Sequence, residues 1–148
     1  MSLKETLMQD LKTAMKEKDQ LRKNTVTMIR AAILQIEKDN KIELDDEGVL
    51  DIISKQLKQR RDALIEFGKG QREDLIEQTN AEIEIILSYM PEQLSVAELT
   101  DMIKNTIDKL GLTQQKEIGK LMNEIMPLVK GKADGRTINQ IAREFLSD

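Results

Sequence analysis

The chain lacks both cysteine and histidine. Without cysteine it has no disulfide, no thiolate nucleophile and no cysteine-ligated zinc. Without histidine it lacks the usual general base near neutral pH and the commonest metal ligand. Its serines therefore have no histidine to activate them, and no glycine-rich phosphate-binding loop of a known type is present. We therefore expect no metal and no cofactor, and an enzyme that works alone is the weakest hypothesis for the function.

Long apolar runs and aromatic side chains are also scarce. No run approaches the roughly 20 apolar residues that a membrane-spanning helix needs, and the N-terminus lacks the apolar segment of a signal peptide. Together with the missing cysteine, these absences predict a cytoplasmic protein with no membrane partner. Aromatic residues make up only 2% of the 148 residues, so the core is predicted to be aliphatic, built from leucine, isoleucine and methionine.

Charged residues, by contrast, make up 34% of the chain, and the formal net charge is −4. A chain with a negative net charge does not attract nucleic acid as a whole, so any anion-binding surface has to be local. Apolar residues recur at helical spacing along nearly the whole chain, and no stretch alternates as a strand would. The sequence therefore predicts an all-α protein.

The predicted helices fall into two groups. Pro91 and the polar residues after it, "PEQLS", separate the groups, because the residue before a proline avoids the helical conformation. Four helices within residues 1–91 are predicted to form an N-terminal domain that resembles a four-helix bundle. Three helices within residues 92–148 are predicted to form a small C-terminal three-helix bundle.

Capping residues predict where several helices begin. Ser2 with Glu5 and Ser95 with Glu98 each have the spacing of a capping box, and Asp134 is the predicted N-cap of the last helix. The apolar stripes then predict which side chains face the core. The inward-facing residues predicted toward the ends of these stripes include Met15, Ile36, Leu110, Leu128 and Phe145.

Two basic clusters interrupt the helical pattern. The first contains Lys55, Lys58, Arg60 and Arg61, in and around "KQRR". On a helix Lys58 and Arg61 share a face, whereas Arg60 points elsewhere. Because runs of charge usually face water, the pattern favours a solvated helix surface.

The second basic cluster lies in the last third of the chain. Six cationic side chains stand against three anionic ones from Lys116 to Arg143, a local excess of three positive charges. Helix capping explains Gly131 and Asp134, but it requires neither Lys132 nor Arg136. The start of a helix also offers backbone N–H groups to a phosphate. From the residues alone, a plain turn and a phosphate-binding surface both remain open.

A resemblance to the YqeY family rests on three segments: "LKQRRDALIEF", "GQREDLIEQTNAEIEIILSYMPEQLS" and "EIGKLMNEIMPLVKGKADGRTINQIAREFL". These small bacterial proteins are related to the tail of GatB, the tRNA-binding subunit of the glutamine-dependent Asp/Glu-tRNA amidotransferase. The resemblance covers essentially the whole chain, and the third segment is the part shared with the GatB tail. It implies an all-helical protein in two parts and a link to tRNA. The family-level label, carbon–nitrogen ligase with glutamine as amido donor, descends from the GatB connection.

With this resemblance, the favoured hypothesis is a noncatalytic tRNA-binding or tRNA-enzyme accessory module. The expected partners are tRNA and, secondly, an aminoacyl-tRNA synthetase or an amidotransferase subunit. The alternative is a protein–protein adaptor that docks on such an enzyme through an exposed apolar patch. If nucleic acid binds, we expect contacts to its backbone rather than to its bases, because no aromatic side chain is interleaved with the cations. The predicted contact residues are Lys120, Lys130, Lys132, Arg136 and Arg143.

Overall fold

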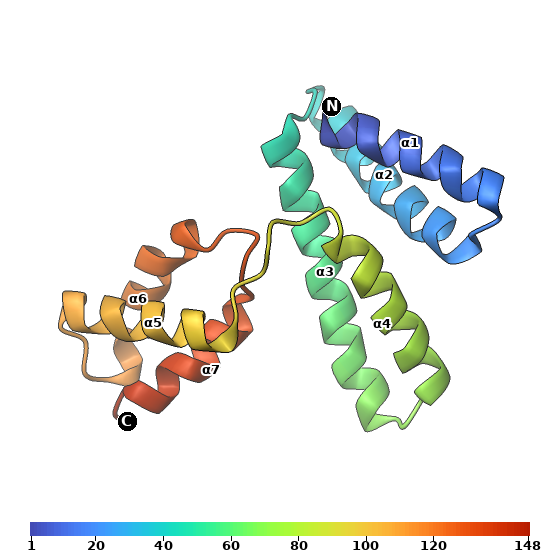
Figure 1. The fold of residues 1–148 in the computed structure, drawn as a ribbon. Helices are drawn as coiled ribbons and strands as arrows, with labels where there is room; N and C mark the ends of the chain where they lie inside the picture. The colour runs from blue at the N-terminus through green and yellow to red at the C-terminus, as the bar shows by residue number, and fades with distance from the viewer. The chain divides into compact units, whose positions relative to one another are not determined.

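The computed structural model describes all 148 residues, Met1 to Asp148, and is helical almost throughout (Figure 1). The prediction of an all-α protein is confirmed, since the closest approach to a strand is an isolated parallel bridge between Gln114 and Ser147. The α-helices are α1 (Leu3–Glu17), α2 (Gln20–Asn40), α3 (Asp46–Lys69), α4 (Glu73–Leu87), α5 (Val96–Leu110), α6 (Ile118–Ile125) and α7 (Gly135–Phe145). Two short 3-10 helices flank α6, namely η1 (Gln115–Glu117) and η2 (Met126–Leu128). None of the helices combines the length and the apolar character that crossing a bilayer requires.

The chain divides into two compact units, Met1–Met90 with α1 to α4 and Pro91–Asp148 with α5 to α7. Each unit has its own cluster of buried apolar side chains. The largest side chains that are fully buried belong to leucine, isoleucine, valine and one threonine, and none to methionine. The predicted aliphatic core is therefore present, but the methionines lie at its margins rather than within it.

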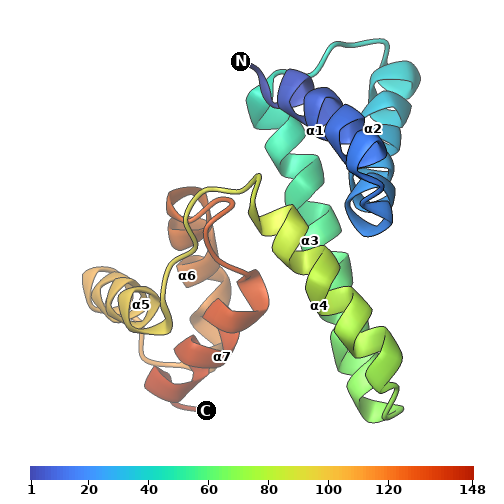
Figure 2. The ribbon, with the colours of Figure 1, turned by 45° about the vertical axis from the view of Figure 1, so that its right-hand side comes forward.

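In the N-terminal unit, α1 and α2 lie side by side as an antiparallel hairpin, and α3 and α4 form a second hairpin (Figures 1 and 2). Two residues, Lys18 and Asp19, connect α1 to α2. The inward faces of the helices pack together because their apolar residues recur every three or four positions. The buried apolar residues of this unit are Leu7, Val26, Ile29, Ile33, Val49, Ile53, Leu57, Ile85, Ile86 and Tyr89.

In the C-terminal unit, α5 packs against both α6 and α7 around the second core. The end of the chain closes this unit, because the Ser147 amide donates to the Thr113 carbonyl at 2.9 Å and the Gln115 amide donates to the Ser147 carbonyl at 2.7 Å. The buried residues of this core are Leu99, Ile103, Ile107, Leu112, Leu121, Ile125, Val129, Ile138, Ile141, Ala142 and Leu146.

The predicted helix starts are largely as expected. Ser2 and Glu5 form the complete capping box at the start of α1. Ser95 caps α5 by accepting from the Glu98 amide at 3.1 Å, but the Glu98 carboxylate accepts from the Ser95 hydroxyl rather than from its backbone. Asp134 is the N-cap of α7. The second capping box is therefore only half formed, and the other caps are confirmed.

Five side chains predicted to face inward are exposed: Met15 by 55%, Ile36 by 36%, Leu110 by 37%, Leu128 by 62% and Phe145 by 42%. Leu128 lies in η2 rather than in α6, so the helical spacing that placed it inward has already ended. In the last turn of α1 the inward position belongs to Ala14, and Met15 is rotated from it by about 100°. Near the end of α7, Ala142 and Leu146 take the buried positions in place of Phe145.

Candidate functional site

The segment between α6 and α7 differs from the expected single turn. The sequence pattern extends α6 to Leu128, but α6 ends at Ile125 and η2 follows, with Pro127 in its first turn. Proline has no N–H to donate to the preceding turn and therefore ends regular helix pairing. The chain then turns through Gly131, whose positive φ of 76° suits a residue without a Cβ.

Backbone hydrogen bonds fix the shape of this loop. The Lys132 amide donates to the Val129 carbonyl at 2.7 Å. The segment just before α5 holds the other side, because the Gln93 side chain donates to the Gly131 carbonyl at 2.6 Å and the Leu94 amide donates to the Lys132 carbonyl at 2.9 Å. The loop is thus braced by the chain that leads into α5, and the lysine side chains project from a fixed backbone.

The five predicted contact residues are all exposed, but they come from different places in the unit. Lys120 lies on α6 with its Nζ 3.8 Å from Glu117. Lys130, Lys132 and Arg136 fall within seven residues around the braced loop. Three of the five cations thus belong to one loop and the start of the helix after it, and Lys120 belongs to another helix.

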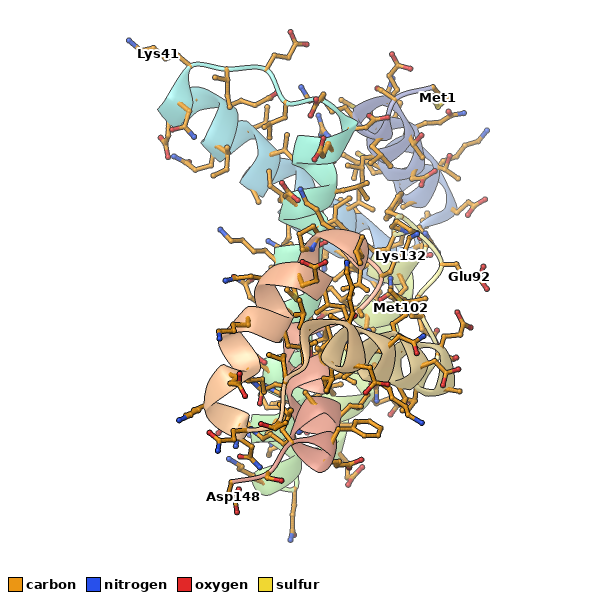
Figure 3. The ribbon with its side chains drawn as sticks, turned by 90° about the vertical axis from the view of Figure 1, so that its left-hand side faces the viewer. Met1, Lys41, Glu92, Met102, Lys132 and Asp148 are labelled. Atoms are coloured by element: carbon orange, nitrogen blue, oxygen red, sulfur yellow. The ribbon has the colours of Figure 1, made fainter.

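Arg143 lies two turns beyond Arg136 on α7, which is roughly 10 Å along the helix axis. Its Nε donates to Asn139 at 2.7 Å. Figure 3 shows Lys132 and Asp148 at opposite ends of the C-terminal unit, in keeping with this spread. The start of α7 offers less to an anion than the sequence suggests, because the Asp134 carboxylate already accepts from the Arg136 amide at 3.3 Å. Any anion at this loop would depend on the cationic side chains.

The first basic cluster contains the one charged side chain of the protein that is buried. Lys55 and Lys58 are exposed, but Arg60 is only 7% exposed. Its guanidinium donates to Gln56 on α3 and to the Met28 sulfur on α2, at 3.4 Å for the sulfur. Its Nε lies 3.6 Å from a carboxylate oxygen of Glu82 on α4. The prediction of a solvated surface is wrong for Arg60, which instead links three helices.

A groove of about 500 Å³ runs along the α1–α2 hairpin of the N-terminal unit. Leu7 and Ile33, both buried, contribute to its lining from the two helices. Met8 and Leu34 also line it, with exposed fractions of 37% and 57%. The groove thus presents apolar side chains that the protein's own core leaves uncovered.

Charged side chains line the two ends of the groove unequally. At one end Lys4 donates to Glu37, whose carboxylate also accepts from the Leu44 amide at 2.8 Å. The hydrogen bond from Lys4, followed by that from Leu44, holds the pKa of Glu37 below its ordinary value. Glu5 lies at the same end and completes the cap of α1. Both carboxylates of the groove are therefore already engaged.

At the other end the groove is bordered by Lys12 of α1 and Arg30 of α2. Lys12 lies eight residues beyond Lys4, or about 12 Å along α1, and Arg30 lies seven residues before Glu37 on the antiparallel helix. Neither cation has a carboxylate within ion-pairing distance. The result is an apolar groove with a neutralised end and a cationic end.

No pattern in the sequence predicts this groove, although two of its lining residues stand out as apolar. Met8 and Leu34 are apolar residues outside the stripes that predict the core of α1 and α2. An apolar residue on the outward side of a helix is common and by itself has no meaning. Only the pairing of α1 with α2 brings Met8 and Leu34 to the same groove.

Comparison with curated proteins finds fungal relatives. A protein of Pyrenophora tritici-repentis is 32% identical over 130 residues, which cover 86% of this chain and 71% of the relative. A protein of Kluyveromyces lactis is 35% identical over 133 residues, covering 89% and 69% of the two chains, and one of Candida glabrata is 33% identical over 131 residues, covering 87% and 69%. Each is named "Altered inheritance of mitochondria protein 41, mitochondrial".

These relatives correct two expectations from the sequence. Their name describes a mitochondrial protein and does not describe a tRNA-amidotransferase module. The hypothesis of a tRNA-enzyme accessory module is therefore contradicted, and with it the alternative of an adaptor that docks on an aminoacyl-tRNA synthetase or an amidotransferase subunit. The expectation of a cytoplasmic protein is contradicted as well, because the relatives are named as mitochondrial.

The family, by contrast, agrees with the resemblance seen in the sequence. A profile described as "Yqey-like protein" matches residues 4–146, which is nearly the whole chain and includes both compact units. The same residues also align with the Pyrenophora tritici-repentis and Kluyveromyces lactis relatives at more than 30% identity over most of the length of those proteins. The chain belongs to the YqeY family.

Proposed function

We propose that this protein is a protein-binding module, and that the α1–α2 groove is the surface that engages its partner. The observation that carries this proposal is the groove itself, about 500 Å³ in volume and lined by Leu7, Met8, Ile33 and Leu34. Soluble domains rarely leave a contiguous apolar depression uncovered unless it binds something. The lining residues belong to two paired helices, so the groove is preformed and needs no rearrangement to accept a partner.

A catalytic role has less support. The groove contains no histidine or cysteine, and its carboxylates, Glu5 and Glu37, are occupied by a helix cap and by Lys4. A general acid or base has to reach a substrate proton, which an engaged carboxylate does poorly. Binding is the activity that this set of side chains supports best.

Site-specific photocrosslinking in cells tests the proposal. A photoreactive amino acid would be placed at Met8, at Leu34 or, as a matched control, at Ile65 of α3, which is 44% exposed and does not line the groove. We expect the same adduct from positions 8 and 34 and none from position 65. Equal adducts at all three positions, or none at positions 8 and 34, would contradict the proposal.

We also propose that the two compact units are separate domains, with the boundaries 1–91 and 92–148. In this view the first packs as a four-helix bundle-like domain, and the second as a three-helix bundle that resembles the GatB tail. Two separate buried clusters, one in each unit, support the division. Expression of each range alone, followed by thermal denaturation, tests it. We expect each fragment to unfold in one cooperative transition, and a fragment that is already unfolded would contradict independent folding.

A separate prediction concerns five exposed cations that would contact a nucleic-acid backbone: Lys120, Lys130, Lys132, Arg136 and Arg143. Support comes from the exposure of all five side chains and the grouping of three around the braced loop. The test measures the affinity for bulk RNA at low and moderate salt and compares the wild type with the double variant Lys130→Glu, Lys132→Glu. Unchanged affinity in the double variant would remove these residues from the prediction.

A further inference from the structure

We infer that the occupant of the α1–α2 groove is an amphipathic helix of a partner protein, with acidic residues at the end that lies over Lys12 and Arg30. This inference rests on the proposed function and names the chemistry of the partner. It combines the apolar lining, the unequal ends of the groove and the backbone that surrounds it.

The backbone around the groove favours a helix over an extended segment. The groove is walled by α1 and α2, whose backbone N–H and C=O groups pair within each helix. An added strand would find no free backbone groups to pair with, whereas a helix satisfies its own. Two antiparallel helices with an apolar groove between them therefore accept a third helix, whose apolar residues recur every three to four positions.

The charges at the rim determine which helix fits. At the Lys4 end the carboxylates of Glu5 and Glu37 are already engaged, so this end neither needs nor offers a strong charge partner. At the far end Lys12 and Arg30 have no carboxylate within ion-pairing distance. Glutamate or aspartate on the bound helix would complement both cations and would fix the direction in which it lies.

The length of the groove sets the length of its occupant. Lys4 and Lys12 are eight residues apart, so the lined segment is about 12 Å long. That is roughly two turns of helix in direct contact, with an acidic residue in the turn beyond. A partner segment of about three turns is enough to cover Met8 and Leu34 and to reach Arg30.

Helical peptides provide the test. Three stapled peptides of about three turns would share one leucine stripe and would carry glutamate, glutamine or lysine at one end, so that helicity and apolar contact stay equal. Fluorescence anisotropy would measure their binding to the full chain. Because partly exposed ion pairs contribute modestly, we expect the glutamine peptide to bind about threefold more weakly than the glutamate peptide, and the lysine peptide about tenfold more weakly.

Charge reversal on the protein completes the design. Lys12→Glu with Arg30→Glu should invert the preference, so that the lysine peptide binds better than the glutamate peptide. The matched control is Lys55→Glu with Lys58→Glu, two exposed lysines of α3 that do not line the groove. This control should leave the order of the peptides unchanged. Circular dichroism of both double variants establishes that they remain folded.

Several outcomes would overturn the inference. One is equal affinity for the three peptides, and another is binding of dodecanoate in the groove with no peptide binding, which would make the occupant an acyl chain. A groove occupied by a second copy of this chain, seen as a dimer that Leu34→Glu abolishes, would also overturn it. If no peptide binds but the crosslinks from positions 8 and 34 persist, the helical occupant is wrong and the proposed function stands. Loss of the crosslinks as well would defeat both.

Discussion

Tyr89 donates its phenolic hydrogen to the carboxylate of Asp10, which joins residues 79 positions apart in the chain. Asp10 lies in the middle of α1, and Tyr89 lies just after the end of α4. The ring of Tyr89 is buried, being only 8% exposed. The bond therefore ties the first helix of the N-terminal unit to the last one.

Replacing Tyr89 by phenylalanine should destabilise the N-terminal unit by about 1–2 kcal/mol near neutral pH, because the hydrogen bond has a charged acceptor. Burial, followed by the bond to Asp10, raises the pKa of Tyr89 above its ordinary value of 10.0. Above pH 10.0 the unfolded chain releases the phenolic proton while the folded chain retains it, so the wild type loses stability as the pH rises. The difference between wild type and Tyr89→Phe should therefore shrink there. Urea denaturation at neutral pH and above pH 10.0 would measure both effects, and a difference that grows with pH would contradict the assignment.

Arg60 should be intolerant of truncation. Its side chain is 9% exposed and that of Glu82 is 19% exposed, so removal of the guanidinium leaves a carboxylate with little access to water. We expect Arg60→Ala to cost about 2–3 kcal/mol of unfolding free energy, and Arg60→Ala with Glu82→Gln to cost less than the sum of the single changes. Chemical denaturation of the four chains of this cycle is the measurement. Additive losses would show that Arg60 acts through packing alone.

Glu117 should make the C-terminal unit sensitive to acid. Its carboxylate accepts from the Thr113 and Gln114 amides at 3.2 Å each, and these bonds hold its pKa below the ordinary value of 4.5. A lowered pKa in the folded state means that stability is present above pH 4.5 and is lost as the pH falls through the folded value. Glu117→Gln should flatten this part of the curve of melting temperature against pH. If the melting temperature of Glu117→Gln falls as steeply with acid as that of the wild type, other groups cause the loss of stability.

Replacing Lys18 by glycine should stabilise the protein. It ends α1 with φ 60° and ψ 33°, a left-handed conformation that a side chain with a Cβ disfavours. Lys18→Gly should raise the unfolding free energy by about 0.5–1 kcal/mol, as glycine does at such caps. The matched control, Lys16→Gly within the last turn of α1, should lower it by about 1 kcal/mol. Thermal denaturation of both variants would show whether the sign follows the backbone conformation.

Helix starts could be predicted from the sequence because the capping residues lie within a few positions of one another. The caps at Ser2 and Asp134 follow from two or three neighbouring residues, and both are present. The predicted end of α6 was wrong. The periodic apolar pattern continues to Leu128, but Pro127 has already ended the regular backbone hydrogen bonding of the helix. A stripe of apolar residues shows which face is buried, but it does not show where the helix stops.

Features that depend on the pairing of distant segments could not be predicted. The sequence predicts that Arg60 is a solvated cation, whereas its burial depends on Met28 and Glu82 from two other helices. The groove likewise requires Met8 and Leu34 to meet across the α1–α2 hairpin. The five cations near the C-terminus were predicted from their charge and from the family resemblance, and neither shows how closely the five side chains lie in space. Each case requires spatial neighbours that a single sequence does not specify.

The bond from the Leu94 amide to the Lys132 carbonyl makes that amide an internal reporter of the loop before α7. Its rate of hydrogen–deuterium exchange depends on how often this bond opens, so any ligand that reshapes or clamps the loop changes the rate at a position remote in sequence. The Leu94 resonance of an isotope-labelled sample could thus follow occupancy of the loop without a substitution at any lysine. Events at Gly131 and Lys132 would be read from the chain that leads into α5.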